Sequence, residues 1–138
     1  MGDVSTSIIR TAARGALAVV LVAAGLAHLF WLRRGFRIAV PEWATRLLRT
    51  DKDMIVVASG AAELVLGTAL IALPRERRRI GVAVAAFFVA VFPGNVHQWR
   101  TRRPAPGLRT DRARLPRLFL QPLLVWWALW ATTPEERN

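Results

Sequence analysis

Four stretches of mostly apolar residues, separated by short segments that hold nearly all of the charge, make up this 138-residue chain. A helix that crosses a bilayer needs about 20 mostly apolar residues, and each stretch is close to that length. None of them alternates apolar and polar residues with the period of two that is typical of a barrel strand. The stretches predict helices over about 8–32, 54–73, 80–99 and 115–132, joined by loops over 33–53, 74–79 and 100–114. We therefore expect an all-α membrane protein with one integral membrane domain, 1–138, folded as a four-transmembrane-helix antiparallel bundle.

Two of the loops carry patterns of their own. In the first loop, Trp43, Leu47 and Leu48 fall on one face of a short helix that would begin after Pro41, and an apolar face on such a helix favours a position in the membrane interface. The segment 100–117 is rich in arginine and proline, which predicts an irregular or extended conformation.

Composition narrows the class of protein. Apolar residues make up 54% of the chain, more than a soluble domain of this size can bury. The chain contains no cysteine, so thiolate catalysis and cysteine-ligated metal sites are excluded. The net charge of +11 comes from basic runs next to the helix ends, where anionic lipid head groups explain them better than nucleic acid does. Nineteen of the twenty basic residues are arginine, a bias typical of GC-rich bacterial genomes, so we expect a multi-pass protein of the bacterial cytoplasmic (inner) membrane.

Glu63 is the outstanding polar residue within the predicted helices. At 1.5 Å per residue, it lies about 14 Å from Met54, the first residue of the second predicted helix, and this depth is near the middle of a bilayer. An ionisable group at that depth is a functional candidate by default. Ser59, Gly60 and Gly67 share its face, and small residues there would let another helix approach closely.

The other polar candidates lie near the helix ends on the side of the two long loops. They are His28 on the first helix, Asn95 and His97 on the third, and Gln121 on the fourth. In an up-down bundle these ends face the same side, so the polar groups should converge in one half of the bundle. We take Glu63 and His28 as catalytic candidates that hold or move a proton, and Asn95, His97, Gln121 and Ser59 as ligand-binding candidates.

Each candidate also has a structural alternative. Glu63 or His28 would tie two helices together as a neutral, hydrogen-bonded group. His97 would simply lie in the interface beside Trp99, while Asn95 and Gln121 would satisfy backbone groups freed by the neighbouring prolines.

A series of motifs resembles the DoxX-like family of small four-helix bacterial membrane proteins. The motifs that carry the resemblance are Ala-Gly-Leu-Ala-His over 24–28, Pro-Glu-Trp over 41–43, Ser-Gly-Ala-Ala-Glu-Leu-Val-Leu-Gly over 59–67, Leu-Pro-Arg over 73–75, Val-Phe-Pro-Gly-Asn-Val over 91–96 and Arg-Leu-Pro-Arg-Leu-Phe-Leu-Gln-Pro over 114–122. The resemblance implies a four-helix transmembrane bundle and relatives associated with quinone-linked sulfur oxidation. The fold of the DoxX-like family is also similar to that of quinone-using vitamin K epoxide reductases, whose paired cysteines are absent from this chain. Leu29 and Gly94 depart from the family, which has an aromatic residue and more usually an alanine at these places.

The function expected is the binding of a lipophilic redox compound such as a quinone, as a subunit or accessory of a membrane redox or oxidative-stress system. Turnover would need electrons from a redox partner protein, and the sequence leaves open whether the chain is an enzyme. The alternative is a non-enzymatic assembly or stress-protection factor that acts through helix contacts with another membrane protein. A haem held by His28 and His97 is disfavoured because lone histidines are usually structural. No metal site is expected, because no spacing signature supports one.

Overall fold

The computed structural model describes residues 2–102 and 110–134, and every regular element in these ranges is a helix. The elements, in chain order, are α1 (Gly2–Leu26), a π-helical turn η1 (Ala27–Trp31), α2 (Arg33–Phe36), a 3₁₀ turn η2 (Arg37–Ala39), α3 (Glu42–Leu48), α4 (Lys52–Ala72), a 3₁₀ turn η3 (Pro74–Glu76), α5 (Arg77–Thr101) and α6 (Asp111–Thr132). Three helical stretches are long and apolar enough to cross a membrane, namely Val4–Trp31, Lys52–Ala72 and Pro74–Thr101. The expected all-helical fold with membrane-type helices is therefore confirmed. α6 is not among these three stretches, and Arg117, Gln121 and two prolines lie within it.

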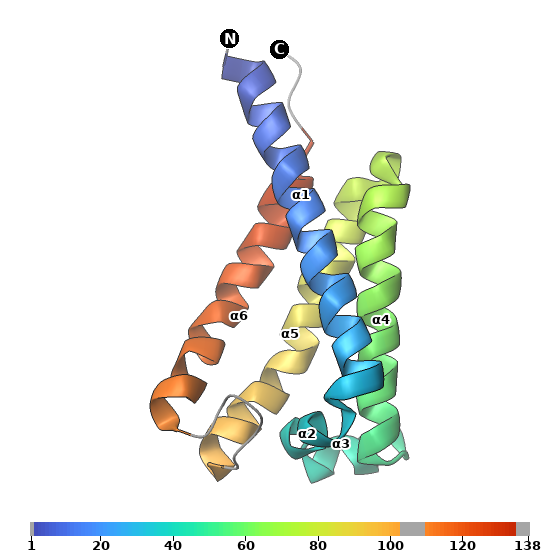
Figure 1. Ribbon diagram of the computed structural model, residues 1–138, viewed down its shortest axis with the longest axis vertical. Coiled ribbons are helices and arrows are strands. Elements are labelled where there is room, and N and C mark those ends of the chain that lie inside the picture. The colour runs from blue at the N-terminus through green and yellow to red at the C-terminus, as the bar shows by residue number, and fades with distance from the viewer. Residues whose placement is uncertain (1, 103–109, 135–138) are drawn as a thin grey trace.

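The long helices associate as two pairs. α1 packs along α4 and α5 packs along α6, while α1 also contacts α6. Figure 1 shows both chain termini at one end of the molecule and the short helices α2 and α3 at the opposite end. The chain passes from α4 to α5 near the end that carries the beginning of α1, whereas the connection between α1 and α4 lies at the other end.

Glycines allow the backbones of α1 and α4 to approach closely. A Cβ atom added at Gly25 would lie 2.7 Å from the carbonyl oxygen of Gly60, and one added at Gly67 would lie 2.9 Å from that of Ala18. Real Cβ atoms do not come so near to backbone oxygens, so a larger residue at either glycine would force the helices apart. The small face predicted around Glu63 is thus the face that contacts α1.

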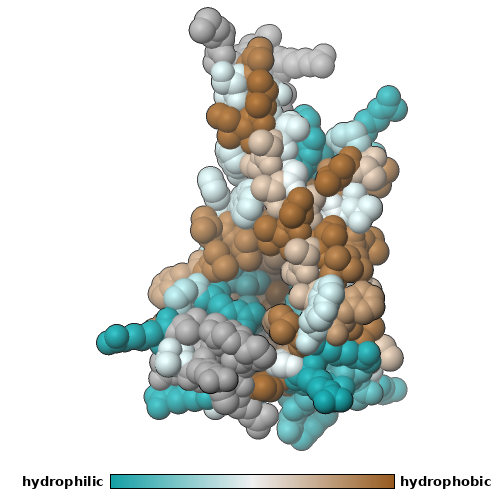
Figure 2. Space-filling model, viewed as in Figure 1, coloured by the Kyte–Doolittle hydropathy of each residue, from teal (hydrophilic) through white to brown (hydrophobic). Residues whose placement is uncertain are grey.

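The apolar core lies where the four long helices meet. Its fully or nearly fully buried members are Leu17, Ala18, Leu21, Leu70, Val84, Ala85, Phe88 and Ala128. Many large apolar side chains point outward instead, including Val65 and Phe119, which are 67% and 74% exposed. Figure 2 shows this hydrophobic surface along the helices, with hydrophilic residues gathered at the end that carries α2 and α3. Such a surface suits contact with lipid rather than water.

Polar contacts join α1 to the last turns of α6. The Arg10 guanidinium donates to the backbone oxygen of Thr133 at 3.2 Å and lies over the ring of Trp130. The indole nitrogen of Trp127 donates to the backbone oxygen of Ala13 at 3.1 Å. These contacts join α1 to the end of α6.

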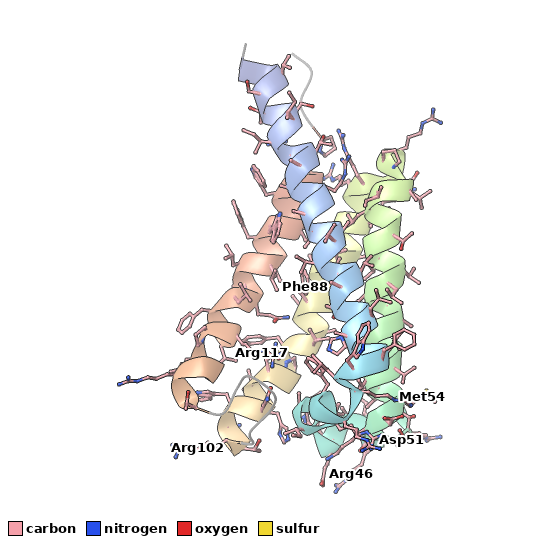
Figure 3. All side chains as sticks on the ribbon, in the orientation of Figure 1. Arg46, Asp51, Met54, Phe88, Arg102 and Arg117 are labelled. Carbon is pink, nitrogen blue, oxygen red and sulfur yellow. The ribbon has the colours of Figure 1, made fainter. Side chains whose placement is uncertain are left out.

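The first connection contains the short helix that the sequence predicted after Pro41. Pro41 has an extended backbone and precedes α3, whose Trp43, Leu47 and Leu48 are all exposed. The next helix, α4, begins where the Asp51 carboxylate accepts a hydrogen bond from the backbone N–H of Met54 at 2.7 Å (Figure 3). This N-cap satisfies a donor that the first turn of a helix otherwise leaves unpaired.

The prediction of an irregular segment over 100–117 is wrong at both of its ends. α5 extends to Thr101, and α6 already begins at Asp111, with Pro116 inside it; residues 103–109 lie outside the described part of the chain. α5 is likewise continuous through Pro93. A proline removes only one hydrogen bond from a helix, and neighbouring helices can hold the rest of the backbone in place.

Candidate functional site

His28 and Glu63 form a hydrogen-bonded pair between the first two long helices. His28 Nδ1 lies 2.5 Å from Glu63 Oε2, and the two side chains are 14% and 9% exposed. Glu63 is on α4 and His28 is on the π-helical turn that follows α1. The sequence selected both residues separately, and the structure brings them into direct contact.

The π-helical turn Ala27–Trp31 sets the position of His28. In this wider turn the backbone N–H of Leu32 donates to the oxygen of Ala27 at 2.7 Å. Gly60 of α4 lies opposite, and a Cβ atom there would come within 3.0 Å of the His28 Cβ. The close approach of the two backbones therefore places the imidazole beside Glu63. Single π-helical turns are frequent at functional sites, but no sequence pattern predicted this one.

The ring of Phe36 covers the imidazole of His28. The ring centroids are 3.9 Å apart, in an edge-to-face arrangement. Phe36 also lies below the guanidinium of Arg117 from α6, whose Cζ is 5.7 Å from the ring centroid. This residue of α2 thus contacts a group from each of the two helix pairs. Sequence reasoning missed it because nothing in a loop phenylalanine indicates a tertiary contact.

An ionic cluster fastens α2 to the beginning of α4. Arg33 Nε and Arg37 Nε donate to Asp53 Oδ1 at 2.9 and 2.8 Å, and the Nη2 atoms of both arginines contact the same carboxylate. The hydrogen bond to Asp53 raises the pKa of the Arg33 guanidinium above its ordinary value. The two arginines flank Phe36 in the chain, so the cluster fixes the segment that covers His28.

Asn95 and Gln121 form the second pair of predicted residues, between α5 and α6. Asn95 Nδ2 donates to Gln121 Oε1 at 2.8 Å, and Gln121 Nε2 donates to the backbone oxygen of Phe88 at 2.6 Å. Gln121 therefore donates to a backbone carbonyl of α5, which is not the group that Pro122 would free within α6. Asn95 bonds across to α6 instead of repairing the backbone near Pro93.

A third contact between α5 and α6 was not anticipated. Arg117 Nη1 donates to Oε1 of Gln98 at 3.1 Å, and Gln98 is only 3% exposed. Gln98 follows Asn95 by three residues, and Gln121 follows Arg117 by four. The Asn95–Gln121 and Gln98–Arg117 hydrogen bonds are therefore one helical turn apart along the interface between α5 and α6. In the sequence, only this spacing could have indicated the Arg117–Gln98 contact. The spacing becomes informative only when α5 and α6 are known to pack against each other.

Within the described residues, the side chains of Ser59 and His97 make no hydrogen bond to the His28–Glu63 pair or to the Asn95–Gln121 pair. The Ser59 hydroxyl donates to the Ile55 carbonyl of its own helix at 2.9 Å. At His97 the backbone oxygen accepts a hydrogen bond from Thr101, and no hydrogen bond of its ring is found in the described part of the chain. Over the same residues, no group of three or more His, Asp or Glu side chains could hold a metal ion.

Comparison with known proteins gives one match. Residues 17–132 match the family described as a domain of unknown function, DUF8561. No curated protein and no solved structure matches the chain.

Proposed function

We propose that this chain, which belongs to the DUF8561 family, is a membrane protein that binds a lipophilic redox compound such as a quinone beside His28 and Glu63. The proposal includes a bundle of four antiparallel membrane-spanning helices, with α6 as the fourth and α3 in the interface. A bacterial inner membrane is the proposed location, and the resemblance to the DoxX-like family supports the same class of protein.

The His28–Glu63 contact carries this proposal. A carboxyl group and an imidazole within helices of this apolarity are costly to maintain, and such groups usually serve a proton relay or a ligand. Nδ1 of His28 and Oε2 of Glu63 are within hydrogen-bond distance, at 2.5 Å, so the two side chains would act on a ligand as one connected unit. A ligand pocket needs mainly apolar walls and a few convergent polar groups; the His28–Glu63 pair would supply the polar groups, and Phe36 would supply part of the apolar wall.

The second ring nitrogen of His28 is the atom that would face the ligand. Nδ1 is engaged with Glu63, whereas Nε2 has no hydrogen-bond partner within the described residues. Among those residues, the only side-chain nitrogen or oxygen that is both enclosed and unpaired is Arg10 Nε, so Nε2 is accessible. Glu63 holds the ring in place, and Nε2 can donate a hydrogen bond to a carbonyl oxygen of the ligand.

A titration of the purified protein in mild detergent with a short-chain ubiquinone analogue, followed by tryptophan fluorescence, tests the proposal. Glu63→Gln and His28→Asn should each weaken binding about tenfold or more, since each removes a hydrogen bond to a charged or polarised group. Glu76→Gln and His97→Asn are the matched controls and should bind like the unchanged protein. Unchanged affinity in both pair variants would refute the proposed site.

The assembly-factor alternative predicts a different result in the same preparation. Native mass spectrometry of protein extracted from its own host would then show a stoichiometric complex with another membrane protein and no small molecule. A bound quinone mass that is lost in Glu63→Gln supports the ligand-binding function, and a bound haem would redirect attention to the two histidines.

A further inference from the structure

Arg117 is a half-buried cation on the inner side of α6. Its guanidinium lies between the ring of Phe36 and the buried amide of Gln98. Figure 3 shows Arg117 between α5 and α6, whereas Arg46 and Arg102 lie at the outer end of the molecule. This arginine therefore differs in setting from those at the molecular surface.

Most of the hydrogen-bonding capacity of Arg117 is unused. A guanidinium has five N–H donors, and within the described residues Arg117 makes one hydrogen bond, to the neutral oxygen of Gln98. The remaining donors are accessible, because Arg10 Nε is the only enclosed and unpaired side-chain atom of that kind in the described ranges.

Arg117 has no carboxylate partner within the part of the chain whose side chains the structure describes. Arg33 and Arg37 share the Asp53 carboxylate, Arg46 pairs with Glu42, and Arg79 pairs with Glu76. No carboxylate of the described residues lies within ion-pair distance of Arg117. A positive charge withdrawn from water without an anion is costly, so a negative group from outside the chain is the natural partner.

The side-chain amide of Gln98 offers an N–H donor beside Arg117. Gln98 Oε1 is occupied by Arg117, which leaves the Nε2 of Gln98 without a partner in the described structure. One turn along the same interface, both polar atoms of the Gln121 amide already have hydrogen-bond partners. A site with one positive charge and surplus N–H groups favours a ligand with several oxygen acceptors.

We infer that Arg117 and Gln98 form a binding site for a phosphate oxyanion. The planar guanidinium can present two parallel N–H groups to two phosphate oxygens, and the Gln98 amide can donate a third bond. The phosphate could belong to an anionic lipid or be free in solution. The lipid source agrees with the position of Arg117 near the end of an apolar helix, where head groups lie. Both sites adjoin the ring of Phe36, but the donors of this one come from Arg117 and Gln98 and not from the His28–Glu63 pair.

Native mass spectrometry of the full chain in detergent, with added phosphatidylglycerol or phosphatidylcholine, tests the inference. The unchanged protein should retain phosphatidylglycerol, and Arg117→Gln should reduce the retained fraction about tenfold, as expected for a lost charge-assisted bidentate contact. Arg112→Gln changes an exposed arginine of the same helix and should leave retention unchanged. Arg117→Lys keeps the charge but loses the planar fork, so its retention should be intermediate. This variant also keeps the test valid if Arg117→Gln does not fold.

A second titration with inorganic phosphate alone, monitored by protein NMR, separates the two sources. Binding of both probes at Arg117 supports a general phosphate site, and binding of phosphatidylglycerol alone supports a lipid site. Equal loss of lipid in the Arg112 and Arg117 variants would overturn the inference, as would the failure of both probes to bind. Quinone binding should persist in Arg117→Gln, so failure of one proposal leaves the other standing.

Discussion

The ring of Phe36 meets the imidazole of His28 edge to face, with centroids 3.9 Å apart and an interplanar angle of 69°. Phe36 belongs to the connection between α1 and α4, outside the long helices. The histidine is therefore held on one side by Glu63 and covered on another by a segment whose own position depends on the Asp53 cluster.

Phe36→Ala should destabilise the protein by about 1–3 kcal/mol, less than the loss of a fully buried phenylalanine, because the ring is only partly buried. The free energy of unfolding in detergent measures this effect. Phe30→Ala removes a ring that is 70% exposed and should stay within about 0.5 kcal/mol of the unchanged protein. Equal losses in the two variants would show that Phe36 has no special packing role.

Gly25→Ala should destabilise the contact between α1 and α4 by about 1–3 kcal/mol through overpacking. The new methyl group would lie 2.7 Å from the Gly60 oxygen and 2.9 Å from Leu64 Cγ. Gly15→Ala is the matched control on the same helix, since nothing lies within 4 Å of its Cβ position. That variant should gain up to about 1 kcal/mol from helix propensity, and a gain in both variants would contradict the close approach.

A double-mutant cycle over His28→Ala and Glu63→Ala should give a coupling energy of about 1–3 kcal/mol, because the two groups are in contact and largely buried. Either single substitution leaves its partner enclosed without a hydrogen bond. The exposed Glu76–Arg79 pair provides the reference cycle, and its coupling should be clearly smaller. Additive effects at His28 and Glu63 would refute a direct interaction.

Asp53→Asn should loosen the segment 33–39, detected as faster amide hydrogen exchange there. The effect should shrink in high salt, since the cluster is at the surface. The ion pair raises the pKa of Arg33 and lowers the pKa of Asp53, so its contribution is present at neutral pH, is lost in strong alkali when Arg33 loses its proton, and is lost in acid when Asp53 is protonated. Protection of 33–39 that is unaffected by both substitution and salt would contradict the fastening role.

The amino-acid order alone was sufficient to predict the helical fold, and it singled out Glu63 and His28, which the structure places in contact. Apolar stretches of membrane-spanning length leave few alternatives to helices, and an ionisable residue within them stands out by its cost alone. The small residues Gly60 and Gly67 also indicated correctly which face of α4 contacts another helix. These inferences need only local periodicity and the chemistry of single residues.

The partners of those residues depended on the tertiary structure. The π-helical turn at Ala27–Trp31, the cover provided by Phe36 and the contact of Arg117 with Gln98 each arise between segments far apart in the chain. The start of α6 ahead of Pro116 likewise runs against the local preference of proline for a helix break. Periodicity reports which face of a helix is buried, but the residue that meets that face is decided only when the helices pack together.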